Sequence, residues 1–206
     1  MKTPYMLAII IDIMPHLDAV TEGKITRASI YKSFTKQNSE KEIARIMSQN
    51  YDMIPSGYDL ELSFYNYSRD LAIRMWLLDK VSVQSESSNY VIDMDEILAL
   101  GKKNLKKSKV ISSEFNKFFA EDARTFLARK GAQITFLDNR ARFYHKSIME
   151  YYSARFLYDA LKGFKDRESN CMELLGMKLL YGNSKTDQES DVLNFLVQMI
   201  EDNDHQ

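Results

Sequence analysis

Residues 141–162 read ARFYHKSIMEYYSARFLYDALK, and the rest of the chain is organised around this stretch. Its first five residues alternate in character, which predicts a strand with Phe143 and His145 on one face. Ser147 and Glu150 then have the spacing of a capping box. We therefore expect a strand that leads directly into a helix beginning at Ser147.

The predicted helix carries apolar residues on most of its surface. Only Arg155, Asp159 and Lys162 line up on the remaining side. A helix with a single narrow apolar stripe packs on one side only, whereas this pattern indicates packing on several sides. We expect it to be the central helix of the fold.

The composition predicts a globular, mainly helical protein. The chain has 206 residues, 45% of them hydrophobic, with only 7 Gly and 3 Pro, which allows one or two small domains with real cores. Twenty-eight basic residues balance 29 acidic ones, so no overall field attracts nucleic acid or an anionic membrane. A single cysteine, Cys171, excludes an internal disulfide, and no segment reaches transmembrane length. We expect a soluble, cytoplasmic protein.

The first half of the chain reads as helices. Thr3 and Pro4 are suited to begin a buried helix that Pro15 limits at its other end. Thr26 is suited to cap a second helical region, which is either one long helix or two. Regular apolar spacing from Asp59 to about residue 80 predicts a further helix.

The second half has the element order of a winged helix. A helix is expected over 113–129, ended by Gly131, and two short strands over 132–137 and 141–145 form a hairpin before the central helix. A short helix over 94–100 and two tail helices, around 172–181 and from 187, complete the expectation. The fold class is therefore mainly α, a helical bundle followed by a winged helix with a small β-hairpin.

A serine-rich stretch between two β-prone pieces after residue 80 suggests a domain boundary there. We expect a helical domain over 1–80, a winged-helix domain over 81–165 and a helical extension over 166–206.

Motifs of catalysis are missing from the sequence. It contains no phosphate loop, no dinucleotide-binding glycine motif, no nucleophile elbow and no metal-ligand spacing of Cys and His. The acidic pair Glu121 and Asp122 suits a helix start, and the lysine run over 102–109 suits a solvated loop better than a phosphate site. We expect no catalytic residue, no metal and no enzyme activity in this chain alone.

His145 is the strongest candidate for a binding role. It precedes a helix N-terminus, where free N–H groups and the helix dipole favour an anion such as a phosphate. A histidine at such a position can also be purely structural, bonded to local carbonyl groups. The residues alone leave both interpretations open.

The arrangement F-x-H-K-S-x-x-E-Y-x-x-A resembles the winged-helix signature of NACHT-type signalling NTPases of the STAND class. The residues that match are Phe143, His145, Ser147, Glu150, Tyr151 and Ala154. The resemblance implies that His145 contacts the β-phosphate of bound ADP. It also implies that Pro4, at the start of the family's helical domain, packs near the adenine.

In the family, the phosphate loop and the magnesium-binding strand precede the segment that Pro4 begins. The resemblance therefore implies a regulatory arm that senses the nucleotide state of an NTPase core and has no activity by itself. ADP or ATP is expected only when the arm is joined to that core, which is the expected partner. Exchange of ADP for ATP would release the winged helix and expose surfaces for homo-oligomerisation.

Two alternatives have different consequences. A free-standing winged-helix module would bind nucleic acid, and its binding would depend strongly on salt. A helical adaptor would bind a partner protein through exposed aromatic residues, and His145 would then affect only stability. Nucleic acid is not favoured, because the central helix lacks a basic face, and no membrane contact is expected.

Overall fold

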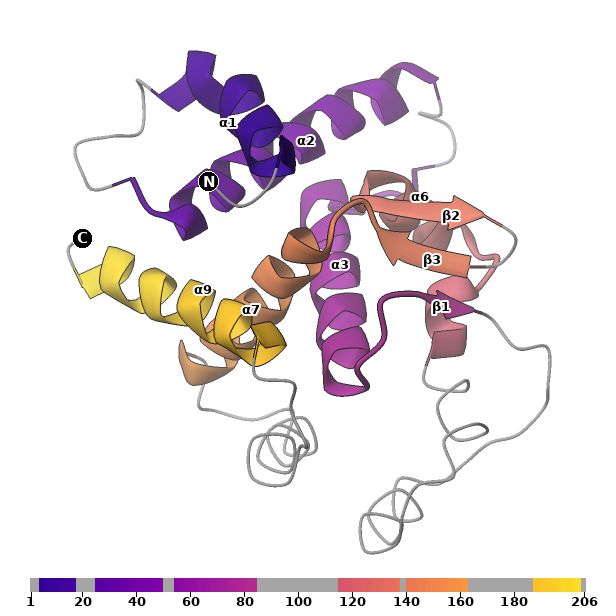
Figure 1. Ribbon diagram of the computed structural model, residues 1–206. Helices are drawn as coiled ribbons and strands as arrows, with labels where there is room; N and C mark the ends of the chain where they lie inside the picture. Colours follow the sequence, from indigo (N-terminus) through magenta and orange to yellow (C-terminus); the bar gives the residue numbers. More distant parts are fainter. Residues whose placement is uncertain are drawn as a thin grey trace, which may run out of the picture.

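The computed structural model describes residues 4–17, 25–49, 54–84, 115–137, 140–162 and 187–204 (Figure 1). Over these residues the protein is mainly helical, with one small antiparallel sheet of three strands. The expected fold class is confirmed.

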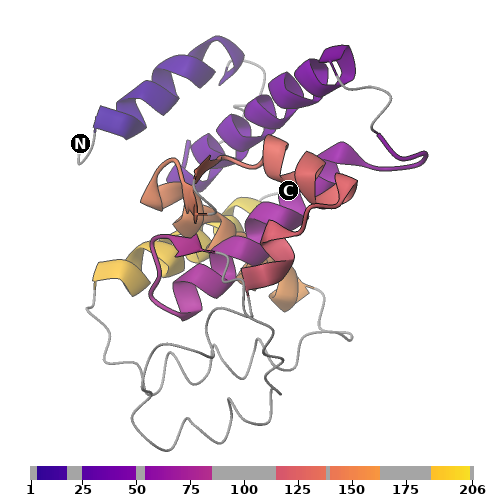
Figure 2. The same cartoon turned by 90° about the vertical axis from the view of Figure 1, so that its right-hand side faces the viewer.

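Helices α1 (Pro4–Leu17) and α2 (Arg27–Gln49) pack against each other and lie on one side of the molecule in both views (Figures 1 and 2). The region after Thr26 is one continuous helix. The Thr26 hydroxyl accepts a hydrogen bond from the backbone N–H of Ser29 at 3.0 Å, as expected of a cap.

Two expectations for α1 are wrong. The helix continues for two residues beyond Pro15, because a proline near a C-terminus removes only one backbone hydrogen bond of the last turns. The helix is also buried on one face only. Ile9 and Ile13 are buried, whereas Leu7 and Ile11 are exposed.

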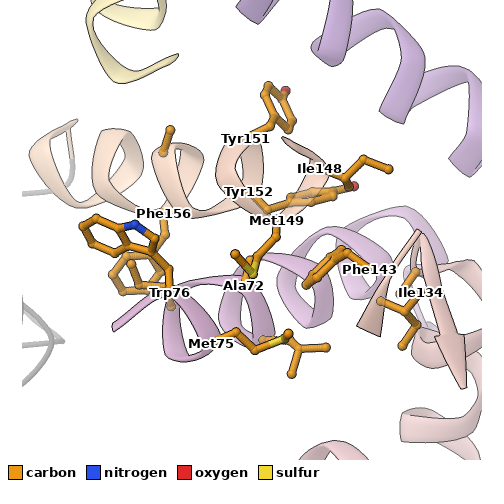
Figure 3. Close-up of a cluster of buried hydrophobic side chains, with 14 of the residues drawn as sticks. Ala72, Met75, Trp76, Ile134, Phe143, Ile148, Met149, Tyr151, Tyr152 and Phe156 are labelled. Atoms are coloured by element: carbon orange, nitrogen blue, oxygen red, sulfur yellow. The ribbon is translucent and has the colours of Figure 1, made fainter. Parts of the chain in front are cut away.

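Helices α3 (Leu60–Leu77) and α7 (Lys146–Lys162) form the centre of the molecule, and α9 (Asp187–Asp204) covers α7 from another side. The Asp59 carboxylate caps α3 by accepting from the N–H of Leu62 at 2.9 Å. Figure 3 shows the core between α3 and α7, in which Trp76 of α3 lies beside Phe156 of α7. The first eleven residues of α7 after Lys146 are almost all buried, which confirms the prediction of a central helix.

The predicted single helix over 113–129 is wrong. The chain forms a short helical piece that includes the 3-10 turn Lys117–Phe119, and α6 (Ala123–Gly131) begins after a break. Asp122 causes the break, because its carboxylate accepts from the N–H groups of Arg124 and Thr125, both at 3.0 Å. The expectation that Asp122 serves a helix start is confirmed.

Gly131 ends α6 as expected, and packing gives a second reason for a glycine. A Cβ atom at this position would lie 2.1 Å from ring atoms of Phe64 on α3. Only a residue without a side chain lets the end of α6 approach α3 this closely.

The sheet is formed by β1 (Val83–Gln84), β2 (Ile134–Leu137) and β3 (Arg140–Phe143), with β3 in the middle. Phe143 pairs with Ile134 of β2, and Ala141 pairs with Val83 of β1. The sequence α3, β1, α6, β2, β3 with this strand order is the arrangement of a winged helix.

Several predictions lie outside the described residues. They are the helices over 94–100 and around 172–181, and the lysine run over 102–109. The domain boundary near residue 80 stays a prediction. Helix α3, which precedes this point in the chain, packs against α7, which follows it.

Candidate functional site

His145 lies in the bend between β3 and α7, and it caps α7 with its own ring. The backbone N–H of Ser147 donates to His145 Nδ1 at 3.2 Å, and the N–H of Ile148 donates to the His145 carbonyl at 3.1 Å. The predicted strand ends at Phe143, so strand alternation does not orient the imidazole. The orientation comes from the cap.

The predicted capping box of Ser147 and Glu150 is therefore wrong. The helix begins one residue earlier, at Lys146, so Ser147 lies within the first turn. Its hydroxyl lies 2.6 Å from His145 Nδ1 and 2.5 Å from the hydroxyl of Tyr31, which belongs to α2. Ser147 connects the helical layer of α1 and α2 to the imidazole instead of capping the helix.

These hydrogen bonds determine which ring nitrogen of His145 carries the proton. A backbone N–H can only donate, so Nδ1 acts as an acceptor and is unprotonated. The proton of the neutral ring is then on Nε2. Burial and the positive charge of Arg27 hold the pKa of His145 below its usual value of 6.5, which favours this neutral form at pH 7. His145 thus presents one N–H donor at Nε2.

Tyr5 stacks on the imidazole of His145. The ring centroids are 4.2 Å apart and the ring planes differ by 11°. Tyr5 follows Pro4, the first residue of α1, so the fold brings the start of α1 next to the start of α7. The side chain of Pro4 is outside the described part of the chain, and its predicted role stays a prediction.

A cluster of charged side chains lies around Arg27 and Glu150. Arg27 of α2 lies 2.9 Å from Asp191 of α9 and 4.0 Å from Glu150 of α7, while Lys146 lies 3.2 Å from Glu150. The Glu150 side chain is 3% exposed, and burial raises its pKa against the opposing effects of Lys146 and Arg27. This cluster joins three helices, so the glutamate of the signature has a structural role here.

An open pocket of about 430 Å³ adjoins His145 on the side of the sheet. Four of its lining residues carry basic groups, namely Arg140, Arg142, His145 and Lys146. Both arginines were missed at the sequence level. The signal for them was the alternation of β3, in which Ala141 and Phe143 are buried and the two arginines between and beside them are exposed.

The remaining features of the described residues offer no other site. They contain no group of His, Cys, Asp and Glu side chains suited to hold a metal ion. None of the helices in the described ranges has both the length and the apolar character needed to cross a membrane. Of the acidic pair at 121 and 122, Asp122 caps the start of α6.

Comparison with protein-family models, with curated proteins and with solved structures finds no match to this chain. The functional interpretation therefore depends on the geometry around His145 and on the resemblance of its signature.

Proposed function

We propose that this chain is the regulatory arm of a NACHT-type signalling NTPase, which senses the nucleotide held by a separate P-loop core. The observation that supports the proposal best is the state of His145. Its Nδ1 accepts from the N–H of Ser147, its lowered pKa favours a neutral ring, which stacks on Tyr5, and its Nε2–H is then a donor.

This chemistry suits contact with a phosphate oxygen of a nucleotide. A neutral N–H donor forms a charge-assisted hydrogen bond to an ionised phosphate, and such bonds are stronger than those between neutral groups. The ring needs no proton from solvent to do so, because Nε2 already carries one. Tyr5 and Ser147 hold the ring in place before any ligand is present, which lowers the entropic cost of binding.

The position of His145 also suits a switch. Tyr5 and Tyr31 belong to α1 and α2, whereas Ser147 belongs to α7, so the contacts of the imidazole span two parts of the fold. A phosphate contact made only when these parts are together favours that arrangement over an open one. Two nucleotide states that differ in this contact would then favour different arrangements.

The test measures ADP release from a complex of this arm with its P-loop core, whether the core is part of a longer polypeptide or a separate protein. His145→Ala is expected to speed ADP release about tenfold or more, because a hydrogen bond to a charged group contributes about 1.5–3 kcal/mol. Lys162→Ala, at the exposed opposite end of α7, is the matched control and should leave the rate unchanged. Unchanged release from His145→Ala would refute the proposal.

The nucleic-acid alternative predicts a different outcome. The sequence predicts a central helix without a basic face, which is α7, but the helix that directly precedes the β2–β3 hairpin is α6. Its basic residues Arg129 and Lys130 lie over the rings of Phe136 and Phe126, at 4.2 and 5.3 Å from the ring centroids. Their stacking leaves them less available for phosphates of DNA. Binding of duplex DNA that weakens steeply with salt would favour this alternative over the regulatory arm.

A further inference from the structure

The two arginines of β3 are held on the solvent side of the sheet by the core. Ala141 is fully buried and Phe143 is 6% exposed, and both point into the same hydrophobic cluster. Since successive side chains of a strand point to opposite faces, Arg140 and Arg142 must both lie on the outer face. Their Cα atoms are separated by two residues of strand, roughly 6.8 Å.

The charges of these arginines are not compensated within the described part of the chain. Neither side chain forms an ion pair or a hydrogen bond to a described residue. Other arginines of the described residues do form ion pairs, as Arg27 does with Asp191 and Arg155 does with Asp159. The described residues that line the pocket beside His145 include no carboxylate.

The pocket combines this positive rim with an apolar wall. Val81 and Met149 are the apolar residues of its lining whose side chains are not assigned to the inner face of β3, and Lys146 adds a basic residue from the first turn of α7. Charges next to a wall of low polarity are less screened than charges surrounded by water, so they attract an anion more strongly. The volume of about 430 Å³ lies within the range of small-molecule pockets, roughly 300–1,000 Å³.

We propose that this pocket binds a small phosphate-bearing molecule through Arg140 and Arg142, in this chain and without an NTPase core. Guanidinium groups present paired N–H donors that match phosphate oxygens, which a lysine does not. Lys146 contributes less, because it is shared with the buried Glu150 at 3.2 Å. The proposal stands apart from the regulatory function, since it does not need the Nε2–H of His145.

The experiment is isothermal titration of pyrophosphate into the 206-residue chain at low ionic strength, about 50 mM, where screening is weak. Binding with a dissociation constant of about 0.1 mM or tighter is expected. The double variant Arg140→Ala, Arg142→Ala should weaken it at least about tenfold, as the loss of a charge-assisted hydrogen bond predicts. Arg124→Ala is the matched control, because that side chain is an exposed arginine on α6.

Further titrations identify which part of the ligand is recognised. ADP should bind at least as tightly as pyrophosphate, and tighter binding of ADP would add a contact with the nucleoside. Adenosine has no phosphate and should not bind. Adenosine binding as tight as that of ADP would overturn the proposal, and so would the absence of pyrophosphate binding.

The variants also separate this proposal from the regulatory function. Binding that is lost in the double arginine variant and kept in Arg124→Ala supports the pocket, whatever the outcome for ADP release. Pyrophosphate binding that is kept in the double variant refutes the pocket and leaves the sensor role of His145 untouched. Both arginine side chains are exposed, so the variants are expected to fold.

Discussion

The two ends of α7 carry clusters of charged residues that differ in one respect. At the C-terminal end, Asp159 lies 3.4 Å from Arg69 and 3.6 Å from Arg155, and it also accepts a hydrogen bond from Tyr65. At the N-terminal end, Arg140 and Arg142 stand beside His145 with no carboxylate among the described residues of the pocket wall. The first cluster is neutralised, because Asp70 lies 3.2 Å from Arg69 and supplies a second carboxylate, whereas the second cluster is not.

This difference indicates that the first cluster stabilises packing, whereas the second is available to bind a ligand. A charge that is partly buried costs free energy unless a partner compensates it, so the cluster around Asp159 is what stable packing between α3 and α7 requires. Exposed arginines without partners contribute little to stability and remain available for a ligand. Substitutions at the two ends should therefore affect different properties of the protein.

The largest loss of stability is expected from Asp159→Ala. The change leaves Arg155, 26% exposed, and Arg69, 22% exposed, without their shared carboxylate. The free energy of unfolding should fall by about 1.5–3 kcal/mol, as measured by urea denaturation. Asp159→Asn keeps an acceptor for Tyr65 and should lose less. A loss no larger than that of Arg142→Ala would contradict the contrast between the two ends.

A smaller loss is expected from Tyr31→Phe. The Tyr31 hydroxyl lies 2.5 Å from Ser147 and is buried, so its removal should lower the free energy of unfolding by about 1 kcal/mol. Tyr144→Phe is the control, since Tyr144 is 59% exposed and should change stability little. Equal effects of the two variants would mean that the hydrogen bond between Tyr31 and Ser147 does not contribute to stability.

The effect of pH should be smaller still and should come from His145. Its pKa is lower in the folded chain than the usual 6.5, so the unfolded chain takes up the proton first as the pH falls. Stability contributed by the neutral ring is therefore lost as the pH drops below 6.5. His145→Gln should remove this dependence in denaturation measurements made across that range.

Glu150 acts in the opposite direction and serves as the internal check. Its pKa is raised above the usual 4.5, so protonation favours the folded chain as the pH falls towards that value. This contribution should remain in His145→Gln. A stability profile that is the same in both proteins would show that His145 does not titrate as its surroundings predict.

The smallest effect on stability is expected from Arg142→Ala. The side chain is exposed on the outer face of β3, and the free energy of unfolding should change by no more than about 0.5 kcal/mol. A slight gain is expected at low salt, because the repulsion between Arg140 and Arg142 is relieved. A loss of stability as large as that of Asp159→Ala would mean that the charged residues at both ends of α7 contribute equally to stability.

The start of most elements could be predicted from the sequence, because it depends on neighbours within four residues. Thr26 caps α2 as expected, the helix expected from Asp59 begins at Leu60, and His145 could be singled out from its position before a helix. The same local reasoning failed for Ser147. Its hydroxyl can either cap the helix or bond a distant residue, and it bonds Tyr31. A pattern of nearby residues contains no information on such a distant partner.

The rest of the site depends on contacts between residues far apart in the chain. Tyr31 and Ser147 are 116 positions apart in the chain, and Tyr5, whose ring stacks on that of His145, is even farther from its partner in sequence. Arg155 and Asp159 were predicted to lie on the side of α7 without apolar residues, but both contact α3, where Arg155 donates to the hydroxyl of Tyr65 and Asp159 pairs with Arg69.

The sequence by itself determined the helical content, the hairpin before α7 and the residue at the centre of the site, since these follow from periodicity and short-range hydrogen bonding. Only the tertiary structure decided the burial and the nearby Arg27 charge that lower the pKa of His145, the ring that stacks on it and the lack of a carboxylate among the described residues of the adjoining pocket wall. The physical reason is that the charge state and the free donors of a side chain depend on what surrounds it in space.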